Sequence, residues 1–456
     1  MAGQEYAQDG HTGDMNGIAA TAGPPTALRE LQDGRLTSDV VGARNGQEPA
    51  HLDDTTPSSS TSVPSHSLTP LERRTPFSVV HVGAGEINFG TTEGPWNHSL
   101  RLERIFGENL MILGIIDPLV DRAREQLDRK IAAGVPGYAS AATWATPDEA
   151  AAALGPEATV DLVIVGAPPH IRGTTSAPAD LDLRLLKALP RTRHWLVEKP
   201  VSAAPPSELA GQRQVLQAYG ESGAVVGVGY FAASLGAVAM MKRILAEKRL
   251  TVMGTSARYY MAYEWARKPA WWDWKLSCGP VVEQATHLVN LSLLFGGPAN
   301  LSSVRTHTVE HSDAPGKLSK IGFDEEGAIA PEARIPRYTS SIWTYEGGAV
   351  GTLTHAVALH GTTYQTELEV VTDGTTFKLY DIYTSSPKLS VYHSDQSSTP
   401  ELHTFDNDDA FETQVRALVA GKPNCTFEQA LQTYELTWAI RQAGERELAA
   451  RRETPK

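Results

Sequence analysis

Cysteine is scarce in this sequence, basic residues are outnumbered, and long apolar runs are absent. The two cysteines, Cys278 and Cys425, are too few for a disulfide framework, which favours a reducing compartment. A formal net charge of -13 argues against a nucleic-acid partner, because phosphate binding needs clustered lysine and arginine. No stretch approaches the ~20 apolar residues of a membrane span, and no spacing of histidine and cysteine resembles a metal site. We therefore expect a soluble, cytoplasmic protein with no membrane or nucleic-acid partner and no metal ion.

The 456 residues suffice for two domains behind a leader. Residues 1–75 are rich in Gly, Ser, Thr, Pro and Asp without an apolar period, so we expect them to be a disordered leader. The first twenty residues are polar and acidic, unlike a signal or transit peptide. Ordered sequence begins at Phe77, and the pattern of elements changes after Pro200. We predict one domain over residues 76–202 and a second over residues 203–456.

The first domain opens with an apolar strand, residues 77–82, that runs into Gly83-Ala84-Gly85. This is the first half of a dinucleotide-binding fingerprint, in which glycines let backbone N–H groups approach a pyrophosphate. The third glycine is missing because Asn88 stands in its place, so an ordinary tight turn explains this turn equally well. If the turn binds a dinucleotide, the contacting residues are Gly83, Gly85, Glu86 and Ile87.

A second apolar strand, residues 110–116, ends in Asp117. An acid at this place binds the ribose hydroxyls of NAD, and it would repel the phosphate of NADP, so we favour NAD. The alternative is a plain turn at the end of a strand. Asp117 lies about a dozen residues beyond the ~20 expected from the fingerprint, which indicates an enlarged loop and helix over residues 91–109.

A third apolar strand, residues 160–166, ends in the rigid turn Ala167-Pro168-Pro169-His170. We expect Ala167, Pro168 and His170 on the nicotinamide side of a cofactor, although His170 is equally explained as a surface turn residue. Strands that alternate with helices at this spacing predict a parallel, doubly wound sheet. Residues 76–202 are therefore expected to form a dinucleotide-binding Rossmann domain.

A fourth apolar run, residues 194–197, ends abruptly in Glu198-Lys199-Pro200. Ligands bind at the carboxyl ends of strands in open α/β sheets, so both ionisable residues are candidates for cofactor contact. Successive strand side chains point to opposite faces, so one of the two faces a crevice while the other braces the loop. A solvated Glu–Lys pair is the alternative. A turn at a ligand site also favours a cis Lys199–Pro200 peptide.

Segments with strand patterns dominate the second domain, at residues 251–263, 340–345, 349–359, 367–371 and 376–380. Asp373-Gly374 is a hairpin signal. Alternation in residues 349–359 places Leu353, His355 and Val357 on one face. We predict an α+β domain with a large open, mainly antiparallel sheet that has helices on one face and a partner subunit on the other.

Between these strands, Gly279-Pro280 opens a helical period that places Glu283, His287 and Asn290 on one face. This polar stripe among apolar neighbours needs either water or a ligand. Four tryptophans just upstream either stack on a sugar ring or simply pack, and they are Trp265, Trp271, Trp272 and Trp274. The candidates for substrate contact are Tyr230, Trp272 and Asn290.

From Phe77 to about Ala450, the order of these motifs resembles the Gfo/Idh/MocA oxidoreductases. The motifs are Gly83-x-Gly85, Asp117, Pro168-Pro169-His170, Glu198-Lys199-Pro200, and Gly279-Pro280 leading into Glu283-x-x-x-His287. The resemblance implies a Rossmann domain followed by an α/β domain that binds substrate and whose open sheet joins a homodimer or homotetramer. It also implies bound NAD or NADP and an active site between the domains.

Family members oxidise a secondary alcohol of a sugar or cyclitol, or reduce the carbonyl, and the resemblance implies the same reaction here. It assigns Lys199 to hydrogen-bond and exchange a proton with the reacting oxygen, and His287 to act as its acid/base partner beside Glu283. A closed cleft would lower the pKa of an amine toward ~7 to 8. The substrate cannot be transferred from relatives, because Glu283 replaces Asp, Pro280 replaces Gly and Asn290 replaces Asp. Two alternatives within the family are a non-catalytic NAD(P)-binding transcriptional regulator of the galactose-repressor type and an NAD-dependent glycosidase.

Overall fold

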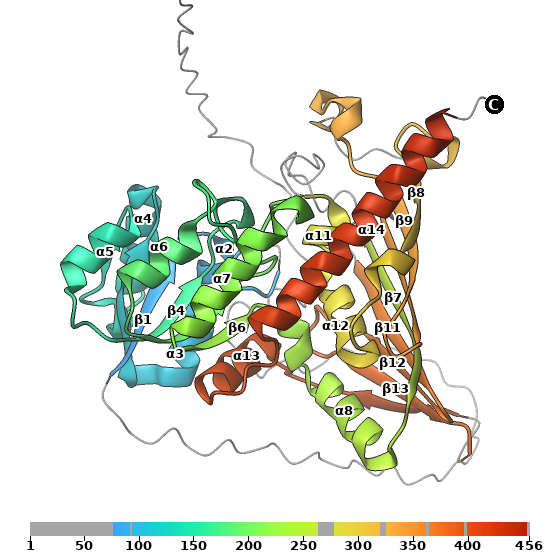
Figure 1. Cartoon of the computed structure of the whole chain (residues 1–456). Coiled ribbons are helices and arrows are strands. Elements are labelled where there is room, and N and C mark those ends of the chain that lie inside the picture. Colours follow the sequence, from blue (N-terminus) through green and yellow to red (C-terminus); the bar gives the residue numbers. More distant parts are fainter. Residues whose placement is uncertain are drawn as a thin grey trace, which may run out of the picture.

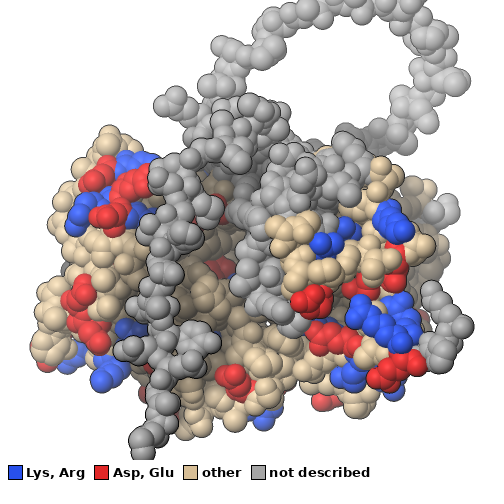
Figure 2. Space-filling view, turned by 90° about the horizontal axis from the view of Figure 1, so that it is seen from above, with Lys and Arg blue, Asp and Glu red and all other residues tan. Residues whose placement is uncertain are grey.

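A computed structural model describes residues 76–91, 94–262, 278–319, 325–361, 364–395 and 399–453. The predicted leader, residues 1–75, lies outside the described residues. Within them, two sheets form two lobes that lie side by side, and the long C-terminal helix runs from one lobe to the other (Figure 1). Seen from above, the molecule is hollowed between the lobes, and acidic and basic side chains are interspersed on its surface (Figure 2).

The first lobe is built on a six-stranded parallel sheet, as predicted, in the order β3-β2-β1-β4-β5-β6. This order is that of a Rossmann fold, with the crevice for a ligand where it reverses between β1 and β4. The strands are β1 (Phe77–Val82), β2 (Leu110–Ile116), β3 (Ala142–Trp144), β4 (Val160–Val165), β5 (Thr192–Val197) and β6 (Val225–Val228). Because β6 pairs with β5, the sheet extends beyond residue 202, where we had placed the end of this domain.

Parallel strands need crossover connections, and helices supply them in this lobe. They are α2 (Glu86–Phe89), α3 (His98–Phe106), α4 (Val120–Ala132), α5 (Pro147–Leu154), α6 (Leu181–Ala188) and α7 (Leu209–Glu221). The first connection is unusual, since α2 has a single turn and the chain resumes a helix only at His98. The enlarged loop and helix predicted for residues 91–109 are therefore present.

The second lobe is built on an eight-stranded sheet in the order β14-β13-β12-β11-β7-β10-β9-β8. All neighbouring pairs are antiparallel except β7 and β10, so the mainly antiparallel sheet is confirmed. The strands are β7 (Val252–Ala262), β8 (Arg305–Val309), β9 (Tyr338–Thr344), β10 (Val350–Leu359), β11 (Tyr364–Thr372), β12 (Thr375–Tyr380), β13 (Lys388–His393) and β14 (Glu401–Thr404). The β11–β12 hairpin turns at Asp373-Gly374, as predicted.

Helices cover one face of this sheet (Figure 1). The predicted inward face of β10 is confirmed, because Leu353, His355 and Val357 are all buried. The α-helices of this part of the chain, among the residues that the structure describes, are α8 (Gly236–Lys248), α11 (Pro280–Glu283), α12 (Thr286–Gly296), α13 (Ala410–Val419) and α14 (Phe427–Glu453). In the part of the chain that the structure describes, no helix is long and apolar enough to cross a membrane.

A buried ion pair connects the two lobes through α3 and α13. Arg101, which is 1% exposed, places its Nε 3.0 Å from Asp409 Oδ2, and its guanidinium also lies 5.3 Å from the ring centroid of Phe411. Asp409 in turn caps α13 by accepting the backbone N–H of Glu412. The enlarged first connection is thereby fixed to the C-terminal part of the chain.

Candidate active site

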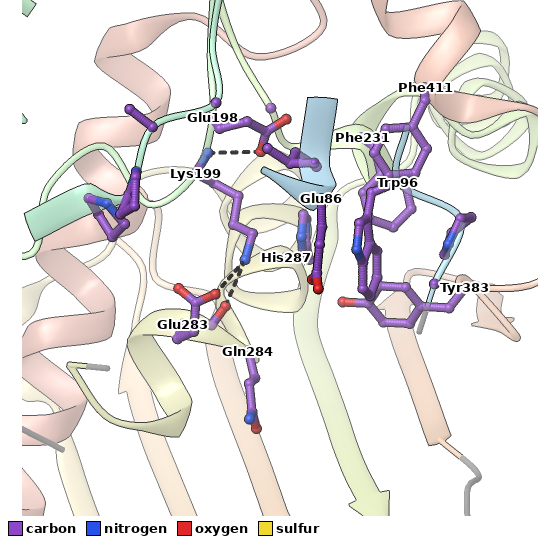
Figure 3. Close-up of a pocket in the computed structure, with 18 of the residues that line it drawn as sticks. Glu86, Trp96, Glu198, Lys199, Phe231, Glu283, Gln284, His287, Tyr383 and Phe411 are labelled. Atoms are coloured by element: carbon purple, nitrogen blue, oxygen red, sulfur yellow. Dashed lines mark hydrogen bonds and ion pairs between the residues drawn. The ribbon is translucent and has the colours of Figure 1, made fainter. Parts of the chain in front are cut away.

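A cavity of about 240 Å³ lies between the carboxyl ends of the parallel strands and the helical layer of the second lobe (Figure 3). From the first lobe it is lined by Glu86, Ile87, Gly94, Pro95, Trp96, Gly166, Ala167, Pro168, Pro169, Glu198 and Lys199. From the remainder of the chain it is lined by Gly229, Phe231, Tyr259, Glu283, Gln284, His287, Tyr364, Tyr383 and Phe411. Of the residues predicted to bind the cofactor, Glu86, Ile87, Ala167, Pro168, Glu198 and Lys199 therefore line one cavity, together with all three residues predicted to be catalytic.

Lys199 and Glu283 meet across this cavity. The Lys199 amine donates to the Glu283 carboxylate, with Nζ 3.2 Å from Oε1, and to the Glu283 backbone carbonyl at 3.0 Å. Both side chains are only partly exposed, 18% and 27%. An ammonium group has three N–H donors, so two are used and one remains for a ligand oxygen. The peptide that follows, Lys199–Pro200, is cis, as predicted.

His287 lies in the same cavity at the start of α12 (Figure 3). Burial and the nearby charge of Lys199 hold its pKa well below the ordinary value of 6.5, so the imidazole is neutral at physiological pH. The ring makes edge-to-face contacts with Phe231 at 4.7 Å and Tyr230 at 5.6 Å between centroids. These contacts fix the orientation of a neutral base beside a cationic amine.

The turn after β1 has the space that a dinucleotide needs. Gly83 has a φ of +91°, which glycine adopts without strain. A Cβ added at Gly85 would meet nothing within 4 Å, so a phosphate can approach this backbone. Asn88, in place of the third glycine, is buried and donates to the carbonyls of Val82 at 3.2 Å and Gly83 at 2.7 Å. The turn therefore fits a pyrophosphate, and the asparagine side chain holds it in shape.

Asp117 lies at the expected edge of the sheet but has partners that the sequence did not indicate. Its Oδ2 accepts the backbone N–H of Ala84 at 2.7 Å and the Arg122 guanidinium at 2.6 Å, and its Oδ1 accepts the backbone N–H of Leu119 at 2.8 Å. Asp117 is fully buried, whereas the Arg122 side chain is 45% exposed. This edge therefore offers an accessible guanidinium beside the carboxylate.

Glu198 has a partner that sequence reasoning also missed. Its Oε1 lies 2.7 Å from Nε2 of His98, and His98 is fully buried. Its Oε2 accepts the backbone N–H of Lys199 at 3.2 Å. A Cβ on Gly229 would lie 2.5 Å from the Glu198 carboxylate, so only glycine fits there. Glu198 therefore braces the loop that carries Lys199. The unusual length of residues 91–109, which include His98, was the one feature of the sequence that pointed to this contact.

Among the described residues, six predicted contacts do not line the cavity, and these are Gly83, Gly85 and Asp117 of the nucleotide edge together with Tyr230, Asn290 and His170. Tyr230 is buried and bonds to Thr286 Oγ1 at 2.8 Å, which places it behind His287. Asn290 does not share the face of Glu283 and His287, because the helix breaks after Glu283, and its Nδ2 bonds to Thr433 on α14 at 3.0 Å. His170 is exposed on a 3-10 turn and does not line the cavity. Trp272 lies outside the described residues.

Comparison with known proteins agrees with this arrangement. Residues 77–241 match the model of an oxidoreductase family with an NAD-binding Rossmann fold, and residues 233–375 match an oxidoreductase C-terminal domain. The chain is 36% identical over 375 residues to the uncharacterized protein C12C2.04 of Schizosaccharomyces pombe, and the match covers 80% of this chain and 96% of that protein.

Solved structures of low sequence identity share the fold. The WlbA dehydrogenase of Chromobacterium violaceum, in complex with NADH and UDP-GlcNAcA, superposes with a TM-score of 0.59 at 14% identity, covering 83% of this chain and 96% of that one. KijD10, a 3-ketoreductase of Actinomadura kijaniata in complex with NADP and TDP-benzene, gives a TM-score of 0.56 at 15% identity, covering 81% and 98%.

Proposed function

Since the chain belongs to the Gfo/Idh/MocA oxidoreductase family and carries its NAD-binding Rossmann domain, we propose that it is an NAD(P)-dependent dehydrogenase or reductase acting on CH–OH groups. The substrate would be a secondary alcohol, or the matching carbonyl, of a sugar, cyclitol or similar small molecule. The observation that carries the proposal is the meeting of Lys199, Glu283 and His287 in a cavity beside the dinucleotide turn. No contact among the described residues favours the two alternatives, a non-catalytic transcriptional regulator and an NAD-dependent glycosidase, over a dehydrogenase.

The cofactor would be held by the turn after β1, by the Ala167-Pro168 segment and by the Glu198–Lys199 loop, and it supplies the hydride chemistry when bound. In the oxidation direction, the carbinol C–H leaves as a hydride with both electrons, and the O–H proton must go to the protein. The free N–H of the Lys199 ammonium would donate to the oxygen as negative charge develops there. Neutral His287 would take the proton, which leaves a carbonyl. Reduction reverses each of these transfers.

Glu283 sets the position of the amine in this mechanism. Its carboxylate and its own backbone carbonyl hold two of the three Lys199 protons, so the remaining donor has one direction. The ion pair also joins Lys199 of the first lobe to Glu283 of the second. The amine therefore takes this position only when the two lobes keep their relative placement. An aspartate at position 283 is one methylene shorter and would not reach the Lys199 amine from the same backbone position. This agrees with the presence of glutamate here, where the family usually has aspartate.

The test is replacement of Lys199 by methionine, which keeps the length of the side chain and removes the donor. We expect turnover to fall by about 10²- to 10⁴-fold, the usual contribution of a proton-transfer residue, with the dissociation constant of NAD(P)H nearly unchanged. Lys187→Met, at an exposed position on α6, is the matched control and should retain full turnover. Assays of a panel of sugars and cyclitols would record net change of NADH, glycoside cleavage without net change, or neither. Wild-type rates in the Lys199→Met enzyme would refute the assigned role.

We also propose a cytoplasmic homo-oligomer joined by the outer face of the eight-stranded sheet. Val350, Val371 and Tyr392 lie in one row across this sheet, because Val350 and Val371 both pair with Gly254, and Tyr392 pairs with the Thr376 partner of Val371. These side chains are 37–39% exposed, an apolar row that a second copy would cover. Both cysteines are free and buried, which is consistent with a reducing compartment. Sedimentation of the protein as a single 49.2 kDa chain would count against the oligomer.

A further inference from the structure

The break in the first helix of the Rossmann lobe brings a tryptophan to the cavity. Helix α2 ends at Phe89, Gly90 follows with a φ of +93°, and α3 begins only after Asn97, whose side chain accepts the N–H of Leu100. Gly94, Pro95 and Trp96, which lie between the two helices, all line the cavity. An unbroken helix would have carried these residues away from the strand ends.

The indole of Trp96 is fixed against both lobes. A Cβ on Gly94 would lie 2.2 Å from the indole ring, so the ring rests on the glycine backbone. Although Trp96 belongs to the first lobe, it packs against the hydrophobic core of the second. The helix after it is held by the buried pairs of His98 with Glu198 and Arg101 with Asp409. Trp96 is therefore a fixed wall of the cavity.

Aromatic side chains of the second half of the chain form the remainder of that end of the cavity. Phe231 stacks on Phe411 with centroids 4.5 Å apart, and Tyr383 lies 5.5 Å from Phe231. Figure 3 shows Trp96 beside Phe231, Tyr383 and Phe411, on the opposite side of the cavity from Lys199. Aromatic faces favour flat apolar surfaces, including the C–H face of a ring.

Figure 3 draws the Glu86 carboxylate between Lys199 and the aromatic group, so charged groups lie toward the catalytic pair and aromatic rings lie beyond them. The rings of Tyr259 and Tyr383 meet edge to face with centroids 6.1 Å apart, and Gln284 Oε1 lies 3.1 Å from Nε2 of buried His355. A ligand hydroxyl turned toward these walls would leave water without gaining a full set of partners. The end of the cavity beyond the catalytic pair is therefore suited to the apolar part of a ligand.

We propose that Trp96 is a specificity-determining residue and that, with Phe231 and Tyr383, it forms an aromatic slot for an uncharged cyclic alcohol or ketone with one apolar ring face. This inference rests on the proposed function, because Lys199 and His287 define which end of the substrate reacts. The ring enters the slot by its C–H face, and the reacting carbon stays at the amine. Acyclic alcohols with the same reacting group leave the slot unfilled.

Two secondary vicinal diols test the slot, trans-cyclohexane-1,2-diol and butane-2,3-diol, which differ in the ring. Calorimetric titration of each diol into the full-length protein loaded with NAD(P)H measures affinity without turnover, because a reduced cofactor cannot accept a hydride from an alcohol. The value of kcat/KM with NAD(P)⁺ is measured in parallel. We expect wild type to prefer the ring diol by about tenfold or more, a difference of about 1.4 kcal/mol. Trp96→Ala should reduce this preference to about twofold or less, and Trp96→Phe should retain most of it.

The possible outcomes distinguish failure of the aromatic-slot proposal from failure of the proposed dehydrogenase function. Equal binding of the two diols by wild type, or an unchanged preference in Trp96→Ala, would overturn the slot even if both diols were oxidised. Ring preference in binding without turnover of any cyclic alcohol would support the slot and refute the dehydrogenase. Titration of NAD(P)H into each variant establishes that the site is folded. If Trp96→Ala fails this check, a preference in Trp96→Leu equal to that of wild type would overturn the slot.

Discussion

Replacement of Arg122 by alanine should change which nicotinamide cofactor the protein binds. Taken alone, Asp117 favours NAD, since its carboxylate would repel the 2′-phosphate of NADP. In the structure, Arg122 Nη2 lies 2.6 Å from Asp117 Oδ2 and its side chain is 45% exposed. An arginine near this acid is the residue type that accommodates the 2′-phosphate. We therefore expect wild type to bind both cofactors, with Arg122 turning from the carboxylate to the phosphate when NADP is bound.

A hydrogen bond to a charged group contributes about 1.5–3 kcal/mol, and the lower value applies here because the guanidinium is partly solvated and already paired. About 1.5 kcal/mol is roughly tenfold in the dissociation constant. Arg122→Ala should therefore weaken NADPH binding about tenfold. NADH binding should change by less than about threefold, since NADH has no phosphate at this position.

Quenching of tryptophan fluorescence, or calorimetry, would measure both dissociation constants at a fixed salt concentration. Arg124→Ala is the matched control, because Arg124 lies on the same helix, is 59% exposed and pairs with Asp121 rather than Asp117. Equal weakening of NADPH and NADH would indicate damage to the fold rather than loss of a phosphate contact. An unchanged ratio of the two constants in Arg122→Ala would refute the reasoning outright.

Two further predictions concern stability. Arg101→Ala should lower the free energy of unfolding by about 3–5 kcal/mol, because it leaves the Asp409 carboxylate without its buried partner. Arg104 contacts the same carboxylate through a side chain that is 35% exposed, so Arg104→Ala should cost about 0–1 kcal/mol. Equal shifts in the denaturant midpoint of the two variants would contradict this prediction. Acid should also destabilise the protein, because three histidines are buried with depressed pKa values, to about 3 for two of them, and these are His81, His287 and His355. Below pH 6.5 the unfolded chain binds protons that the folded chain does not, so stability is full above pH 6.5 and falls as pH falls, by about 1.4 kcal/mol for each histidine at pH 5.5. Urea midpoints at pH 7.5 and 5.5 measure this, and removal of one of the three, as in His355→Gln, should shrink the difference by about a third.

The order of motifs along the chain was enough to predict the two sheets and most of the cavity. Gly83, Lys199 and Glu283 could be identified because each lies directly after a local signal, an apolar strand or a Gly-Pro helix start. The local signal failed for Asn290, because an unbroken helical period was assumed. In the structure the N–H of Ala285 donates to the carbonyl of Pro280, five residues back, which breaks the helix and rotates α12 relative to α11.

The residues missed altogether act through tertiary contacts. Trp96 reaches the cavity and His98 reaches Glu198 only because the first helix is interrupted. No periodicity within residues 91–109 indicates where that segment packs. The length of residues 91–109 indicated an enlarged connection, but it did not indicate which part of the molecule that connection contacts. Arg122 sits five residues after Asp117, so its pairing results from the turn into α4, a feature visible in the sequence once the strand end is known.

A site divided between two lobes requires that their separation be fixed, and two elements of this chain meet that requirement. Helix α14, with 27 residues, is about 40 Å long and packs Tyr434 against the first lobe while Arg441 donates to the carbonyl of Cys278 at 2.7 Å, one residue before the Gly-Pro start of α11. Helix α3 provides the second connection through Arg101. Because the Lys199–Glu283 contact is only 3.2 Å long, a small change in either connection would break it before any catalytic side chain was altered. Loss of activity from changes at Arg441 or Arg101, with cofactor binding retained, is therefore the expected consequence of building the amine and its carboxylate on different lobes.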